Sequence, residues 1–265
     1  MIRLASLEDE QELRTLITLI DEDDYVLDHI HEWLRQESLF IYERDTIQGM
    51  MRLSYSRDHA AHLGSVRVHP AFRRQGIATA LTEYCIDVCK TDVVRLAIMD
   101  SKISEAVARK TGFLPVATFS LLLKELDSPP FFSPSSARRG TGREAILHVE
   151  NSPLFKQNHS LISSCFTFYT PSAEILEDVL ILFCNDNMAI LDFEIEEALR
   201  KAVQIAYLDP DSELVRNVII EVVTCDMEEI WAVIPRNEEL ITCLKAHGFC
   251  HLEWGETITV FELHL

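Results

Sequence analysis

The chain has 265 residues, 48% of them hydrophobic, which fits one large globular domain or two small ones. Its 24 basic and 43 acidic side chains give a formal net charge of −19, which disfavours nucleic acids and anionic membranes as partners. Seven cysteines, an odd number without a Cys-x-x-Cys pair, together with the lack of a signal peptide, of a long apolar run and of metal-ligand spacing, predict a cytoplasmic, metal-free protein.

The first 125 residues predict alternating strands and helices. Short runs of alternating or continuous apolar residues indicate strands, and longer stretches with an apolar face indicate helices. The predicted order is β-α-α-β-β-β-α-β-α-β, over residues 2–4, 7–20, 26–37, 39–43, 46–55, 62–68, 77–90, 93–99, 102–110 and 114–123.

The most informative motif connects the sixth of these elements to the seventh. After the strand, the chain passes through a turn at Pro70 into Arg73, Arg74 and Gly76, and a helix follows at once. Amide groups at a helix N-terminus lack intrahelical acceptors and carry partial positive charge, and a glycine allows close approach of the backbone. The motif therefore predicts a site for a phosphate or pyrophosphate group.

The spacing Arg73-x-x-Gly76-x-Ala78 resembles the acetyl-CoA signature, Gln/Arg-x-x-Gly-x-Gly/Ala, of the GNAT N-acetyltransferase superfamily. The predicted elements of residues 1–125 also follow the GNAT order. The resemblance implies an α/β (α+β) fold with a mixed, splayed central sheet, and an acyltransferase that uses acetyl-CoA as co-substrate.

The resemblance also implies which residues hold acetyl-CoA. The strand before the signature pairs with the pantetheine amides as an added strand would, and the helix start binds the pyrophosphate with help from two arginines. A serine replaces the asparagine that often opens the following helix. The expected contacts are Val66, Arg67, Val68, Arg73, Arg74, Gln75, Gly76, Ile77, Ala78, Thr79, Ser101 and Ser104.

The catalytic groups depart from the family pattern. Many GNAT enzymes place a glutamate on the strand before the signature, directly before a leucine, and His62 stands at that position here. Histidine suits a general base because its unperturbed pKa lies near 6.5. The tyrosine that usually serves as general acid is replaced by Ala108. A mechanism by positioning alone and a protein that has lost catalysis both remain open.

The second half predicts a degenerate repeat of the first. A linker rich in Pro, Ser and Gly covers residues 126–142, and a lobe follows over 143–265. Within it we expect a strand at 188–193, helix at 194–207, strand at 218–223, helix at 237–247 and strand at 257–261. The acidic run 192–197 stands where the phosphate turn would be, so we expect no CoA site there. An unrelated α/β appendage is the alternative.

Two-lobed chains of this layout are similar to several small-molecule acetyltransferases, including the type that acetylates free histidine. We therefore expect an N-acetyltransferase, monomeric or weakly dimeric, that acts on a small amine or a free amino acid. The alternatives are an acetyltransferase for protein N-termini or lysines, and a non-catalytic acyl-CoA sensor or interaction protein.

Overall fold

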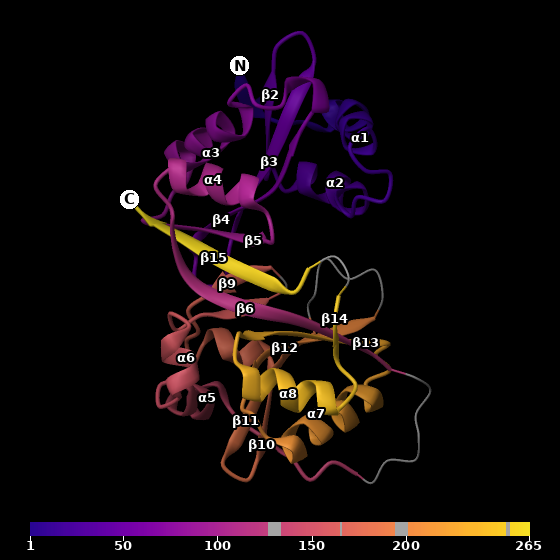
Figure 1. Ribbon diagram of the computed structural model, residues 1–265, viewed down its shortest axis with the longest axis vertical. Helices are drawn as coiled ribbons and strands as arrows, with labels where there is room; N and C mark the ends of the chain where they lie inside the picture. The colour runs from indigo at the N-terminus through magenta and orange to yellow at the C-terminus, as the bar shows by residue number, and fades with distance from the viewer. Residues whose placement is uncertain (127–133, 165, 194–200, 253–254) are drawn as a thin grey trace. The chain divides into compact units, whose positions relative to one another are not determined.

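The computed structural model describes residues 1–126, 134–164, 166–193, 201–252 and 255–265, which form two compact units (Figure 1). Unit 1 comprises Met1–Ala97, Ser101–Leu114 and Phe261–Leu265, and unit 2 comprises Ile98–Asp100 and Pro115–Val260. Both units are mixed α/β, as the sequence predicts. None of the described helices is long and apolar enough to cross a membrane.

The elements of the first half follow the predicted order, with boundaries within a few residues of those expected. They are β1 (Ile2–Leu4), the 3-10 helix η1 (Leu7–Asp9), α1 (Glu10–Thr18), α2 (Val26–Arg35), β2 (Leu39–Glu43), β3 (Ile47–Tyr55), β4 (Ala61–Val68), the 3-10 helix η2 (Pro70–Phe72), α3 (Ile77–Val88), β5 (Val93–Met99), α4 (Lys102–Lys110) and β6 (Leu114–Glu125).

The sheet of unit 1 is mixed and carries helices on both faces. Strands β1 to β4 pair in order and antiparallel, whereas β4 pairs with β5 in parallel. Neighbouring residues of β3 show the two faces. A Cβ on Gly49 would lie 2.9 Å from the Ile77 side chain on α3, whereas Met50 belongs to the core formed by α1 and α2. Helices α1 and α2 therefore cover the face opposite α3.

Of the linker predicted at 126–142, residues 127–133 lie outside the described part of the chain, and residues 138–139 form a strand. The elements that follow are β7 (Arg138–Arg139), α5 (Gly142–Val149), α6 (Pro153–Gln157), β8 (Ile162–Ser164), β9 (Thr167–Tyr169), the 3-10 helix η3 (Ile175–Asp178), β10 (Leu180–Cys184), β11 (Asn187–Asp192), β12 (Ala202–Leu208), α7 (Ser212–Thr224), β13 (Glu229–Pro235), α8 (Glu238–Ala246), β14 (Cys250–His251) and β15 (Thr257–His264).

Unit 2 is built around the strand order β6-β13-β12-β11-β10-β7, in which only β12 and β13 are parallel. Alternate residues of β10 face two cores: Leu182 packs with α7 and α8, and Phe183 packs with α5 and α6. Helices therefore cover both faces of this sheet, so strands such as β12 are buried along their whole length.

Two of the elements predicted in the second half are wrong. Residues 202–207 form strand β12 instead of the end of a helix, and residues 218–223 lie within helix α7 instead of a strand. The rest of the predicted helix, 194–200, lies outside the described residues. A continuous apolar run has neither the period of a strand nor that of a helix, because both kinds of element are apolar on every side when fully buried. The helix at 237–247 and the strand at 257–261 are confirmed as α8 and β15.

Residues 261–265 complete unit 1. Arg95 of β5 donates a hydrogen bond from Nε to Glu262 at 2.7 Å and one from Nη1 to Asp58 at 2.6 Å. The side chains of Arg95 and Glu262 are 7% and 3% exposed. The amide of Leu265 also donates a hydrogen bond to the Asp92 carbonyl at 3.0 Å. A charged group buried this deeply depends on its partners.

We predict that Glu262→Gln destabilises unit 1 by about 3 kcal/mol, because the buried Arg95 cation then loses the carboxylate that accepts from its Nε. Urea denaturation followed by tryptophan fluorescence measures the change. Asp226→Asn removes the exposed pair with Lys201 and is expected to leave the transition unchanged. Equal stability of the Glu262 variant and the parent would show that the buried Arg95 cation does not depend on the charge of Glu262.

Candidate functional site

Strand β4 has a β-bulge against β3, and near this bulge its pairing with β5 ends. Ser65 has φ 53°, and the register of β4 against β3 shifts by one residue between Gly64 and Arg67. Pairing of β4 with β5 ends at Leu63 and Leu96, although both strands continue. The backbone of β4 beyond the bulge therefore has an edge that does not pair with β5. The splayed sheet expected from the sequence is confirmed.

The turn that follows β4 presents backbone amides at its surface. Gly76 is the N-cap of α3 with φ 83°, Arg74 has φ 63°, and the four residues from Arg73 to Gly76 are exposed. The amide of Ala80 is the first to bond back along the helix, to the Gly76 carbonyl at 2.9 Å. The three amides before it, at residues 77–79, have no intrahelical acceptor by the geometry of a helix start. The turn therefore suits an anion.

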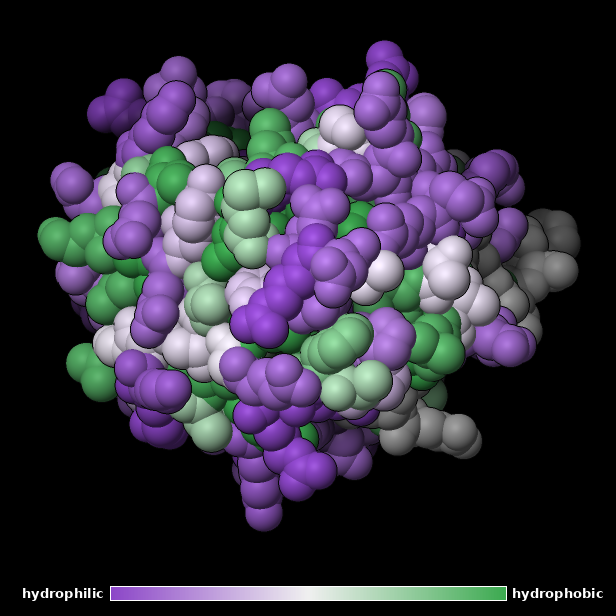
Figure 2. Space-filling model, turned by 90° about the horizontal axis from the view of Figure 1, so that it is seen from above, coloured by the Kyte–Doolittle hydropathy of each residue, from purple (hydrophilic) through white to green (hydrophobic). Residues whose placement is uncertain are grey.

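The side chains expected around this turn lie as follows. Arg73 Nε donates to the Val68 carbonyl at 3.3 Å, and Gln75 donates to the Ala71 carbonyl at 3.4 Å. Figure 2 shows hydrophilic side chains over much of the face that is seen from above, with hydrophobic ones scattered among them. Ser101 caps α4 by accepting from the Ser104 amide at 3.3 Å, and the two hydroxyl groups lie 2.9 Å apart.

Arg67 turns away from the unpaired edge of β4. Its Nη2 donates to Asp24 at 2.8 Å, and its guanidinium lies 5.6 Å from the ring centre of Tyr25. Burial would lower the pKa of this guanidinium, but the hydrogen bond to Asp24 and the negative charge of that carboxylate raise the pKa above its usual value. Only the backbone of Arg67 therefore remains available for a ligand along β4.

Tyr25 also lies at the bulge, although nothing in the sequence predicts it there. Its hydroxyl lies 3.0 Å from Ser65 Oγ, at the bulge. Its ring packs edge-on against His29 and Trp33 of α2. The sequence signal was weak, since a single tyrosine after an acidic run reads as the start of an amphipathic helix.

His62 lies three residues before the bulge, where β4 is still paired with β5. It is 8% exposed and stands opposite Arg95 in the register. A Cβ on Gly64 would lie 3.9 Å from its ring, so the ring is on the face of the sheet that Gly64 shares. The structure thus brings His62 near the bulge but largely covers it.

Unit 2 has a corresponding opening between parallel strands, and its own chain fills it. Pairing of β12 with β13 ends at Ile205 and Ala232, while both strands continue. Ser163 of β8, which is fully buried, donates to the Val233 carbonyl at 3.2 Å. Gln204 of β12 donates to the Ser163 carbonyl at 3.1 Å. Strand β8 therefore forms hydrogen bonds with β12 and β13 beyond the point where these two strands stop pairing, whereas the corresponding edge of β4 in unit 1 does not pair with β5.

The turn after β12 replaces the acidic run 192–197 as the counterpart of the phosphate turn. It reads Asp209-Pro210-Asp211 and leads directly into α7, where Asp211 caps the helix by accepting from the Leu214 amide at 2.7 Å. Asp209 accepts from His148 at 2.6 Å and from Tyr207 at 2.7 Å. Two carboxylates therefore lie at the helix start of unit 2 that corresponds to the exposed turn of unit 1.

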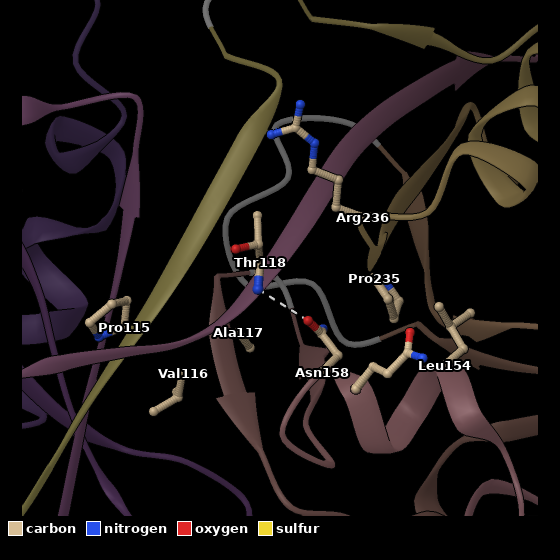
Figure 3. A pocket seen from close by; sticks show the side chains of 9 residues that line it. Pro115, Val116, Ala117, Thr118, Leu154, Asn158, Pro235 and Arg236 are labelled. Atoms are coloured by element: carbon tan, nitrogen blue, oxygen red, sulfur yellow. Dashed lines mark hydrogen bonds between the residues drawn. The ribbon is translucent and has the colours of Figure 1, made fainter.

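Unit 2 also contains an open groove of about 490 Å³ (Figure 3). The Thr118 amide donates to Asn158 Oδ1 at 3.0 Å, and the Arg236 guanidinium points away from Asn158. Arg236 is the only titratable residue among those that line the groove: Pro115, Val116, Ala117, Thr118, Leu154, Gln157, Asn158, Pro235 and Arg236. The described residues that line the groove therefore offer no general base.

Among the residues that the structure describes, no group of three His, Cys, Asp or Glu side chains is placed to hold a metal ion.

Comparison with known proteins agrees with this geometry. Residues 5–113 match the model of the acetyltransferase (GNAT) family. No curated protein matches the chain. A solved GCN5-related N-acetyltransferase from Sphaerobacter thermophilus is similar over 100% of this chain and 95% of its own, with 13% identity and a TM-score of 0.62. A protein from Thermoplasma acidophilum assigned to the acetyltransferases is similar over 100% of both chains, with 14% identity and a TM-score of 0.61. At these identities the likeness shows the fold.

We predict that Gly76→Ala weakens acetyl-CoA binding about tenfold, measured by isothermal titration calorimetry. A Cβ there meets open space, so the effect comes from the left-handed backbone, which costs an alanine about 1–2 kcal/mol and shifts the helix start. Gly112→Ala is the matched control, since Gly112 has φ 94° in the same unit but lies outside the turn. Equal affinity of the two variants would remove the turn from the binding site.

Proposed function

Starting from an acetyltransferase domain of the GNAT family over residues 5–113, we propose that the protein transfers the acetyl group of acetyl-CoA to the amine of a small molecule or free amino acid. The observation that carries this proposal is the exposed turn at Gly76 beside an open edge of β4. A nucleotide pyrophosphate needs the turn, and an extended amide chain needs the edge.

The proposed path of acetyl-CoA along β4 has one direction. We propose that the pyrophosphate binds the amides of residues 74–79, and that Arg73 and Arg74, which are close in sequence, add charge-assisted bonds. The pantetheine then runs back along the backbone of residues 66–68. Because the pyrophosphate occupies one end of this path, the thioester comes to the other end, at the bulge of Ser65. Ser101 and Ser104 follow the C-terminal end of β5, the strand on the other side of the opening, and we retain them as proposed pantetheine contacts.

Transfer requires a neutral amine, so a proton must leave the acceptor ammonium before or during attack on the thioester carbonyl. His62 lies on β4 before the bulge and is retained as the proposed general base. The amine attacks the carbonyl carbon, the carbon–nitrogen bond forms as the carbon–sulfur bond breaks, and the sulfur leaves as a thiolate.

The net charge of −19 supports a cationic acceptor over a nucleic acid or an anionic membrane surface. We propose a cytoplasmic protein, monomeric or weakly dimeric, with one CoA site, because β8 and the acidic turn stand at the corresponding place in unit 2.

The experiment that tests the function measures the release of free CoA thiol from acetyl-CoA with pooled amino acids, polyamines, aminoglycosides and short peptides. Turnover above the hydrolysis background with small amines supports the proposal, whereas turnover with peptides alone indicates a protein acceptor.

We predict that His62→Ala lowers kcat by about 10² to 10⁴, the usual loss for a general base, and leaves the acetyl-CoA affinity near that of the parent. His62→Gln keeps a side chain of similar length in this buried position and is expected to lose activity to the same degree. Steady-state kinetics with the acceptor found above give the values. A change of only a few-fold in both variants would exclude His62 as the base.

A further inference from the structure

The phenol of Tyr25 lies where the proposed acyl transfer releases its leaving group. Tyr25 precedes α2, and its hydroxyl is 3.0 Å from Ser65 Oγ, the residue at which β4 leaves β5. The path assigned to acetyl-CoA ends at this bulge. Tyr25 is half-buried, so its ring is fixed by packing while part of it faces solvent.

Three groups hold Tyr25 in place. The Arg67 guanidinium lies 5.6 Å from its ring centre, and Asp24 fixes that guanidinium through a hydrogen bond of 2.8 Å. His29 and Trp33 pack edge-on against the ring at centroid distances of 6.2 and 6.3 Å. The phenol therefore has a defined direction, which a proton donor in a transition state requires.

Resting on the proposed function, we propose that Tyr25 is the general acid that protonates the CoA thiolate. As the carbon–sulfur bond breaks, the sulfur takes the phenolic proton, and the tyrosinate is left beside the Arg67 cation until water returns a proton to it. In this step the phenol gives its hydrogen to the sulfur, and Ser65 Oγ, 3.0 Å from the phenol oxygen, can donate a hydrogen bond to that oxygen. Tyr25 thus supplies the acid that the Ala108 position lacks.

The proton transfer is close to balanced. An ordinary phenol has a pKa near 10 and an ordinary thiol one near 8.5, so the transfer is uphill by roughly 1.5 pKa units. A neighbouring cation stabilises the phenolate relative to the phenol and narrows this gap. Arg67 is such a cation, and its pKa is raised, so it keeps its charge across the working pH range.

The test compares two variants that remove the same hydrogen bond. Tyr25→Phe keeps the ring and its packing but removes the acid, whereas Ser65→Ala removes only the partner hydroxyl. We expect Tyr25→Phe to lower kcat about 10²-fold with a KM for acetyl-CoA near that of the parent. Ser65→Ala is expected to lower kcat no more than about fivefold, the equivalent of one hydrogen bond. Tyr84→Phe on α3 is the control for loss of a tyrosine hydroxyl elsewhere in unit 1.

The pH profile gives a second readout. An acid must carry its proton, so kcat of the parent is expected to fall as pH rises through the phenol pKa, and the fall should be absent in Tyr25→Phe. The charged or titratable groups that face the phenol are Arg67 on β4, Asp24 in its own turn and His29 on α2.

The outcomes separate the two proposals. A parent protein that binds acetyl-CoA by calorimetry but acetylates no acceptor overturns the proposed function and the acid with it. An active parent with an equally active Tyr25→Phe variant overturns only the role of Tyr25. Equal losses in Tyr25→Phe and Ser65→Ala, with the alkaline fall retained, show that the pair only holds the turn before α2 in place and also overturn that role.

Discussion

The extra residue in β4 at Ser65 is the constraint on which the site depends. Side chains alternate between the two faces of a strand, so one inserted residue exchanges the faces for everything that follows. Before the bulge, Leu63 faces α3, opposite Leu53 of β3. After it, Arg67 stands opposite Met50 and so faces α1 and α2, where it meets Asp24. The same insertion ends the pairing with β5. One local irregularity therefore creates the open edge and brings the turn before α2 to it.

Unit 2 repeats this framework with the opening closed. In both units, a parallel pair of strands flanks a helix, and the pairing stops before the strands do. The difference lies in what meets the free backbone groups. In unit 2, Ser163 bonds to the Val233 carbonyl, and Asp211 caps the helix start. In unit 2, hydrogen bonds within the chain provide partners for backbone groups, and in unit 1 we propose that a ligand provides them. Such partners matter because buried backbone groups are costly to leave without hydrogen bonds.

The sequence predicts the first half well because its elements are amphipathic and its turn chemistry is local. The helix start at Gly76 follows from a glycine in a left-handed position between a strand and a helix, a feature visible within a few residues. Buried elements of the second half lack that periodicity, so the sequence predicts a helix where β12 lies and a strand within α7. Tyr25 could not be foreseen, because its proximity to Ser65 joins residues 40 positions apart through the bulge.

The two halves of the sequence do not coincide with the two units. Strand β6 follows α4 directly, yet residues 115–125 belong to unit 2, while residues 261–265 belong to unit 1. The proposed catalytic unit therefore obtains a buried charge, Glu262, from a segment 167 positions beyond its partner Arg95. Residue Arg95 stands opposite His62 on the neighbouring strand. A fragment cut after β6 would remove Glu262 from the buried Arg95 cation, beside the proposed base, at a cost of several kcal/mol for the lost counter-charge. Loss of activity in such a fragment would thus follow from the missing strand end, without any direct role of unit 2 in the chemistry.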